Sequence, residues 1–300
     1  MKEITTIVSK DNPVLKAARA LRQRKGREKT DAFLVEGRKL ILEAQAAGFE
    51  IKRVFINAGA LARGEAEAGQ WGVESALEEG LFCELAHTVN PQPYIAVVGD
   101  AALGVPKGRD KTKGDGSCVL VLDRVADPGN VGTMLRTGLA AGMGEVLCIK
   151  GTADVFSDKV IRASAGAVFH LIINEDLSAA ECISRVRETG AKLVVCDAGG
   201  GSLYDEDMTG PVAIVIGSEA SGPQEEFLKA ADAVVGIPMA EASESLNAGV
   251  AAAVVMYEAV RQCLSGGKQD ARPATSLGFR GQGHENLWGN TGCSPMLARK

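Results

Sequence analysis

Three segments in the second half of the chain carry side chains whose types and order could do chemistry. They span residues 127–136, 217–222 and 237–247, and they are rich in Gly, Asn, Ser and charged residues. Each follows a short apolar run that is typical of a β-strand. Ligands of open α/β sheets bind beyond the carboxyl ends of the strands, so these segments form the candidate site.

Each segment also has a structural interpretation when it is considered alone. The sequence 127–130 favours a turn, and Asn130 could cap the helix that follows it. Ser243 or Ser245 could cap the last helix, and Glu219 could be a solvated acid in a loop. Because the three segments occur in a particular order and spacing, we interpret them together as one site.

The elements that must position this site are predicted by six apolar runs, which helix-patterned stretches separate. The runs lie at 119–122, 145–149, 168–173, 192–196, 212–216 and 233–237. This alternation predicts a largely parallel sheet with helices on both faces. Residues 245–264 show the clearest helical period, and we expect this helix to pack on the domain through one side, formed by Leu246, Val250, Val254, Tyr257 and Leu264.

The first hundred residues predict a smaller α/β domain. Strands are expected at 33–35, 53–56 and 95–98, and helices at 37–47 and 58–68. Residues 12–25 predict a further helix with one apolar and one basic side. The basic side is interpreted either as a solvated surface or as a face that contacts phosphate.

The pattern along the chain predicts four parts. Residues 1–103 form the first domain, 104–116 a linker rich in Gly, Pro and Lys, and 117–265 the second domain. Residues 266–300 lose all periodicity, and we expect a disordered tail there.

The composition is that of a globular α/β protein. Of the 300 residues, 46% are hydrophobic, 24% charged and 4% aromatic, so Val, Ile, Leu and Ala must form most of the core. No apolar stretch approaches the ~18 residues that span a bilayer, and the N-terminus lacks an apolar signal segment, so we expect a cytoplasmic protein. The seven cysteines form no Cys-x-x-Cys pair, which favours reduced thiols over disulfides or zinc.

The formal net charge of −5 conceals two regions of opposite sign. Residues 10–39 contain ten basic and four acidic side chains, a balance of +6, whereas 196–245 contain ten acidic side chains and one base, a balance of −9. Contact with a nucleic acid is therefore expected to be local and led by the first 40 residues.

The three segments resemble the motifs of the SpoU (TrmH-type) family of RNA 2'-O-ribose methyltransferases, in the SPOUT class. The motif Asp-Pro-x-Asn-x-Gly-x-x-x-Arg is met by Asp127, Pro128, Asn130, Gly132 and Arg136. The motif Gly-x-Glu-x-x-Gly is met by Gly217, Glu219 and Gly222. The third motif, Ile-Pro-Met followed by Ser-Leu-Asn, is met by Ile237, Pro238, Met239, Ser245, Leu246 and Asn247.

Two further stretches are similar to the same family. Residues 158–166 look like its Lys-Val-x-Arg-Ala-Ser-x-Gly stretch, and Phe-Leu-Val-Glu-Gly at 33–37 is similar to the substrate-binding domain of many members. The chain departs from the family at 91–94, where Pro-Gln-Pro-Tyr replaces the usual Pro-Gln-Gly.

The resemblance implies an α/β fold with a small N-terminal L30e-like RNA-binding domain and a C-terminal SPOUT domain with a trefoil knot. It implies S-adenosylmethionine as the cofactor and a homodimer that completes the site. Neither a membrane nor a metal is expected as a partner, since methyl transfer from a sulfonium to a ribose hydroxyl needs no metal. The missing Gly-x-Gly-x-x-Gly argues against a nucleotide-dependent oxidoreductase on an ordinary Rossmann site.

The resemblance also assigns residues to roles. The catalytic set is Asn130, Arg136, Glu219, Ser245 and Asn247. The expected cofactor-binding set is Cys196, Asp197, Ala198, Gly217, Ser218, Glu219, Gly222, Ile237, Met239, Ser245 and Leu246. The expected RNA-binding set is Lys16, Arg19, Arg22, Arg24, Lys25 and Arg38.

The expected activity is RNA 2'-O-ribose methylation, with ribosomal RNA favoured because the extra N-terminal domain is commoner on rRNA-directed relatives. Two alternatives stay open at this point. The chain could methylate tRNA, or it could be a non-catalytic RNA-binding protein that retains the fold, although the complete catalytic set argues against the latter.

Overall fold

The computed structural model describes residues 4–99, 118–240 and 245–265. These residues form two compact units. One unit contains the N-terminal residues together with 124–136 and 151–174, and the other contains the residues just before 124, residues 137–150 and the chain from 175 onward. The predicted linker 104–116 and tail 266–300 lie outside the described residues.

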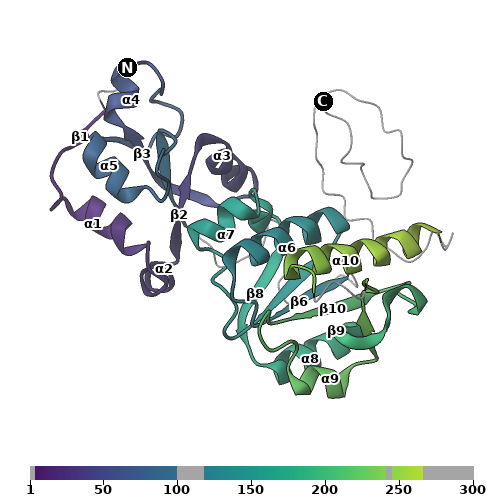
Figure 1. Ribbon diagram of the computed structural model, residues 1–300. Coiled ribbons are helices and arrows are strands. Elements are labelled where there is room, and N and C mark those ends of the chain that lie inside the picture. The colour runs from purple at the N-terminus through teal and green to yellow at the C-terminus, as the bar shows by residue number, and fades with distance from the viewer. Residues whose placement is uncertain (1–3, 100–117, 241–244, 266–300) are drawn as a thin grey trace. The chain divides into compact units, whose positions relative to one another are not determined.

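The N-terminal residues form a mixed five-stranded sheet with short helices around it (Figure 1). The strands, in their order across the sheet, are β1 (Thr6–Ile7), β4 (Glu74–Leu77), β3 (Glu50–Asn57), β5 (Tyr94–Gly99) and β2 (Ala32–Glu36). β5 runs antiparallel to both β2 and β3, whereas β1, β4 and β3 pair in parallel. The helices are α1 (Pro13–Ala20), α2 (Arg24–Thr30), α3 (Arg38–Ala46), α4 (Ala58–Ala62) and α5 (Glu79–Leu85).

Three details of this domain differ from the sequence prediction. The single helix expected at 12–25 is wrong, because the chain turns back after α1: a Cβ on Gly26 would lie 2.0 Å from the Ala20 carbonyl oxygen. The helix expected at 58–68 ends at Ala62. The elements β1, β4 and α5 were not predicted. With two, four and seven residues, they are too short to show a clear period in the sequence.

A cluster of four phenylalanines joins residues 151–174 to the N-terminal sheet within the first unit. Phe33 on β2 lies 5.0 Å from Phe156 and 6.1 Å from Phe169 between ring centroids, and Phe49 lies 5.5 Å from Phe169. Such aromatic pairs add about 0.5–1.5 kcal/mol each to the burial of their area. In a chain with only eight phenylalanines, this cluster makes residues 151–174 an integral part of the unit.

The second half forms the predicted parallel sheet. Its six strands lie in the order β11 (Ala233–Gly236), β9 (Lys192–Ser202), β10 (Val212–Gly217), β6 (Val119–Asp123), β7 (Glu145–Ile149) and β8 (Ile172–Leu177). The pairs β11–β9, β9–β10, β10–β6 and β6–β7 are parallel. Every residue of β6 and β7 is buried, as expected for strands covered on both faces.

One strand of this sheet begins later than predicted. Residues 168–173 were expected to be a strand, but Gly166 adopts a φ of +87° and opens the 3-10 turn η1 (Ala167–Phe169), so β8 starts at Ile172. Val168 and Phe169 are fully buried in this turn, and their apolar character therefore reflects burial and not strand structure.

The helices of the second half are α6 (Pro128–Ala141), α7 (Asp158–Ala163), α8 (Ala179–Thr189), α9 (Glu225–Ala230) and α10 (Ala248–Ser265). The residues that begin and end α8 can be recognised in the sequence. Ser178 and Glu181 form a capping box at its start, and Gly190 ends the helix in the left-handed conformation. No helix among the described residues is long and apolar enough to cross a membrane.

The predicted packing side of α10 is wrong. Its buried face is formed by Ala252, Val255, Met256, Ala259 and Val260. Val250, Tyr257 and Leu264 are 46–58% exposed. Because the helix is apolar on most of its surface, its helical period is compatible with burial of either of two faces. The buried face includes the small side chains of Ala252 and Ala259, which allow α10 to approach β10 more closely.

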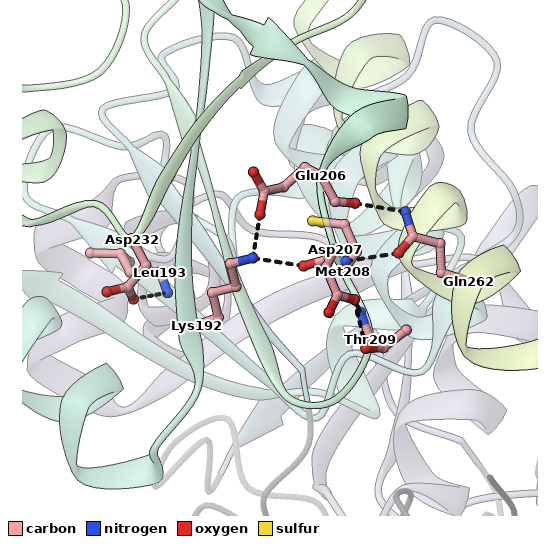
Figure 2. Close-up of polar contacts among 8 residues, drawn as sticks. All are labelled: Lys192, Leu193, Glu206, Asp207, Met208, Thr209, Asp232 and Gln262. Atoms are coloured by element: carbon pink, nitrogen blue, oxygen red, sulfur yellow. Dashed lines mark hydrogen bonds and ion pairs between the residues drawn. The ribbon is translucent and has the colours of Figure 1, made fainter. Parts of the chain in front are cut away.

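A polar network ties the C-terminal half of α10 to the segment that follows β9 (Figure 2). The Gln262 side chain accepts a hydrogen bond from Met208 N at 2.8 Å and donates one to the Glu206 carbonyl at 2.9 Å. Lys192, at the start of β9, donates to the Asp207 carbonyl at 2.8 Å and pairs with the Glu206 carboxylate. α10 therefore has a fixed position on the sheet whose strand ends carry the candidate site.

Candidate cofactor and RNA site

The predicted segment 217–222 and the start of the segment 237–247 meet in the second unit, beside the predicted cofactor residue Asp197. β10 ends at Gly217 and β11 ends at Gly236, and Asp197 lies on β9, the strand between them. A Cβ on Gly236 would lie 3.1 Å from the Asp197 carbonyl oxygen, and one on Gly222 would lie 3.5 Å from an Asp197 carboxylate oxygen. The carboxyl ends of β10 and β11 therefore lie close to Asp197 in the middle of β9 and form one cradle with it.

The loop 217–222 folds tightly on itself, which explains its glycines. A Cβ on Gly217 would lie 2.2 Å from Pro223 N, so no larger residue fits there without a backbone shift. Gly222 has a φ of +66°, and its N–H donates to the Ser218 carbonyl at 2.8 Å. Glu219 is exposed in this turn.

A buried acid that sequence reasoning missed holds this loop on the sheet. Asp123 ends β6, is fully buried, and accepts hydrogen bonds at 2.6 Å from both Gln224 N and Gln224 Nε2. An acidic residue at the end of an otherwise apolar strand is the signal that could have revealed it. Its role here is to position the segment after Gly222, and it has no side-chain surface to offer a ligand.

The remaining walls of the cradle combine apolar and neutral groups. Burial raises the pKa of Cys196 to about 12, so its side chain stays a neutral thiol. Met239, which follows β11, and Leu246, which precedes α10, are 40% and 38% exposed. Backbone carbonyls, glycines and apolar side chains suit an uncharged ring system and a thioether chain better than a phosphate.

Asn247 caps α10, the structural role considered for Ser243 or Ser245. Its side-chain oxygen accepts from Gly249 N at 2.9 Å and Val250 N at 3.2 Å. Ser245 and Leu246 precede it as exposed residues, and Ser243 lies outside the described residues. The third segment is therefore fixed at its helical end.

Asp127, and not Asn130, caps α6 in the first unit. The Asp127 carboxylate accepts a hydrogen bond from Asn130 N at 2.9 Å, and this bond, with Lys159 at 3.6 Å, keeps the Asp127 pKa below its ordinary value. Asn130 is half-buried in the first turn of the helix, and Arg136 is exposed farther along it.

Residues 158–166 pack directly against this motif. A Cβ on Gly132 would lie 2.3 Å from the Ala163 Cβ and 2.9 Å from Ser164 N, so α6 and α7 touch at a bare glycine. The structure thus places Asn130 beside the 158–166 stretch. Asn130 and Arg136 belong to a different unit from Glu219, Ser245 and Asn247, and their approach to one another stays a prediction.

The predicted RNA-binding side chains divide into two groups. Arg19 pairs with the Glu84 carboxylate at 2.5 Å and Arg22 donates to the Glu84 carbonyl at 2.6 Å, so both fasten the α1 region to α5. The others have partners nearby or are exposed: Lys16 pairs with Asp11, Arg24 with Glu28 and Arg38 with Gln70, and Lys25 is exposed.

Among the described residues, no group of three or more His, Cys, Asp or Glu side chains is arranged to hold a metal ion. The described cysteines are free thiols. The second unit offers a glycine-lined cradle where β10 and β11 end beside Asp197. The first unit separately carries Asn130 and Arg136 on α6.

This fold and this set of loops define a known class of protein. Residues 117–257 match the SpoU rRNA Methylase family, and residues 12–96 match the MRM3-like substrate binding domain. The chain belongs to the SpoU rRNA methylase family.

Individual relatives support the same assignment. The chain is 31% identical to the 23S rRNA (guanosine(2553)-2'-O)-methyltransferase RlmP of Bacillus subtilis, over 84% of this chain and 97% of that protein. It is 30% identical to a 23S rRNA (uridine(2479)-2'-O)-methyltransferase of Streptomyces viridochromogenes, over 82% and 88%. The crystal structure of an AdoMet-bound rRNA methyltransferase from Sinorhizobium meliloti superimposes with a TM-score of 0.73 at 29% identity, over 86% and 98%.

Proposed function

We propose that this protein transfers a methyl group from S-adenosylmethionine to a ribose 2'-hydroxyl of ribosomal RNA. The observation that carries the proposal is the cradle formed by the ends of β10 and β11 beside Asp197 of β9, which occurs in a chain of the SpoU rRNA methylase family. Two relatives that the chain covers almost entirely are named as 2'-O-methyltransferases of 23S rRNA, which favours rRNA over tRNA as substrate.

The residues of the cradle fit S-adenosylmethionine. The glycines at 217 and 236 let backbone segments pack closely at the end of β10 and β11, and the exposed Met239 and Leu246 would offer apolar surface to the cofactor. Glu219 is exposed beside them and would attract the sulfonium charge. When bound, the cofactor supplies an electrophilic methyl group.

The difficult step for the protein is the activation of the ribose hydroxyl, whose proton must leave during the attack. Arg136 would clamp the phosphate or ribose of the target nucleotide through its planar fork of N–H donors and stabilise the developing negative charge. Asn130 would orient the ribose, and Glu219, Ser245 and Asn247 would complete the pocket.

The proposal includes a homodimer, and the exposed side of α10 supports it. Leu246, Val250, Tyr257 and Leu264 recur at helical spacing and are 38–58% exposed. We refer to these four side chains as the α10 stripe. A contiguous apolar stripe on a surface helix is typical of an interface, and a second copy of the chain is the occupant we propose. The trefoil knot and the cytoplasmic location are the remaining parts of the proposal.

The decisive experiment is an activity assay with labelled S-adenosylmethionine. The full chain is incubated with total RNA from cells that lack the corresponding modification, and new 2'-O-methyl groups are mapped by reverse-transcription stops at low dNTP. We expect incorporation into 23S rRNA. Incorporation into tRNA alone would establish the alternative substrate, and no incorporation into any RNA pool would refute the enzymatic function.

A further inference from the structure

The loop 86–92 between α5 and β5 presents an apolar side chain almost completely to solvent. Val89 at its tip is 97% exposed, compared with 72% for Val8, and the neighbouring Asn90 is exposed as well. An exposed valine alone requires no explanation, but its surroundings in this loop are specific.

The buried acid Glu36 holds the loop 86–92 in place by hydrogen bonds. Glu36, at the end of β2, is 8% exposed and accepts hydrogen bonds from His87 N at 3.2 Å, Gln92 N at 3.3 Å and the Thr88 hydroxyl. Because Glu36 holds both ends of the loop, most of the conformational entropy of the loop backbone is already lost when the protein folds. A ligand that binds Val89 therefore has little ordering cost to offset.

The loop is also fixed on α7. His87 Nδ1 lies 3.8 Å from the Asp158 carboxylate, and the same helix contacts the catalytic motif through Lys159, 3.6 Å from Asp127, and through Ala163, which packs on Gly132. All these residues belong to one unit. Val89 therefore stands at a fixed place relative to the helix turn that carries Asn130.

The cations around the loop are more exposed than the acids. Arg22 and Arg162 contribute positive charge at His87 and Asp158 and Glu36 contribute negative charge, but Glu36 is buried and the Asp158 side chain is only 12% exposed. Arg22 donates to a carbonyl, which does not neutralise its charge, and Lys159 on α7 has a side chain that is 62% exposed. An apolar tip bordered by cations matches the unstacked base and flanking phosphates of a single-stranded RNA segment.

We propose that loop 86–92 is a specificity element that contacts an unpaired base of the RNA substrate, with Val89 as the apolar contact and Asn90 as a donor and acceptor for the base edge. Because α7 holds the loop against the catalytic motif, the loop would select RNA in which an unpaired base lies at a set separation from the target ribose. This inference rests on the proposed function and adds a determinant of substrate choice to it.

The test compares Val89→Asp and Val89→Ala with the matched variants Val8→Asp and Val8→Ala, which alter another exposed valine of the same domain. For each protein, the kcat and the RNA KM of rRNA methylation, the Kd for S-adenosylmethionine and the melting temperature are measured. We expect Val89→Asp to raise the RNA KM by about 10-fold or more and Val89→Ala by about 3-fold, within the range of a lost base contact. The Val8 variants should match the wild type, and no variant should change cofactor binding.

An unchanged RNA KM for Val89→Asp would refute the proposal. If that variant instead changed the mass in light scattering at an unchanged RNA KM, the tip would contact protein, and the assignment to RNA would be wrong. If the wild type methylated no RNA, the proposed function would fail, and filter binding of labelled rRNA to the same variants would still decide whether the loop contacts RNA.

Discussion

Arg136 is the residue on which the proposed chemistry depends most directly. It is exposed on α6, about two turns from the Asp127 cap. In the described part of the chain, no hydrogen bond that holds a buried contact of the fold uses its side chain. Its side chain is therefore available for substrate, and its removal should affect turnover and leave folding intact.

We predict that Arg136→Ala lowers kcat by about 100-fold or more, the usual effect of losing a group that stabilises charge in the transition state. The Kd for S-adenosylmethionine should stay within about 2-fold of the wild type by calorimetry. Arg136→Lys, which keeps the charge but not the planar fork, should recover part of the rate. Loss of cofactor binding together with activity would instead make Arg136 a structural residue.

His87 carries a prediction about pH. Burial lowers its pKa, although Asp158 and Glu36 oppose this shift while Arg22 and Arg162 reinforce it. The folded state therefore disfavours the imidazolium. The stability from neutral His87 is present above the unfolded histidine pKa of about 6.5 and decreases as the pH falls below it.

Replacement of His87 by Gln should remove that dependence. Urea unfolding midpoints of the wild type are expected to fall between pH 8 and pH 5.5 by more than those of His87→Gln. Burial raises the pKa of Asp158, so this group contributes in the opposite direction and at lower pH. Parallel pH profiles for the two proteins would show that His87 is not desolvated as described.

At the scale of elements, two of the three glycines of α6 have opposite surroundings. A Cβ on Gly132 would meet Ala163 at 2.3 Å, whereas one on Gly138 would meet Leu120 and Met143 at an ordinary 3.5 Å. Of these two positions, only the one that touches α7 requires glycine.

These surroundings predict substitutions of opposite sign. Gly132→Ala should destabilise the protein by about 2 kcal/mol, because the extra methyl group forces the two helices apart. Gly138→Ala should stabilise it by about 0.5–1 kcal/mol, because alanine is the better helix former. Both values are measured by urea denaturation. Equal effects of the two substitutions would contradict the close contact between α6 and α7.

At the scale of the whole molecule, the α10 stripe predicts the oligomeric state. Val250→Glu places a charge in the proposed interface and should convert a dimer into a monomer in light scattering, with loss of methyl transfer if the partner completes the site. Leu228→Glu on α9, which is 36% exposed, is the matched control and should remain dimeric. A monomeric wild type would refute the dimer.

The sequence determined the class of fold and the components of the site. Alternating apolar runs and helices predicted the parallel sheet because strands buried on both faces are apolar along most of their length, as β10 is and as β6 and β7 are apart from one terminal acid each. The segments 217–222 and 237–247 were assigned to strand ends, and the structure brings the first of them and the start of the second to the same edge of the sheet as Asp197. Residue type and order suffice for this, since the carboxyl ends of parallel strands share one edge.

Only the tertiary structure decided which apolar surfaces are buried and which polar groups meet. The period of α10 fitted two faces, and close packing of small side chains on β10 selected the one opposite the stripe. Three contacts show this: Asp123 with Gln224, Glu36 with the loop 86–92, and Asp158 with His87. Each joins residues that are 51 to 101 positions apart in the sequence. Such contacts leave no periodic trace in the sequence, because they depend on where elements meet and not on the pattern within any one of them.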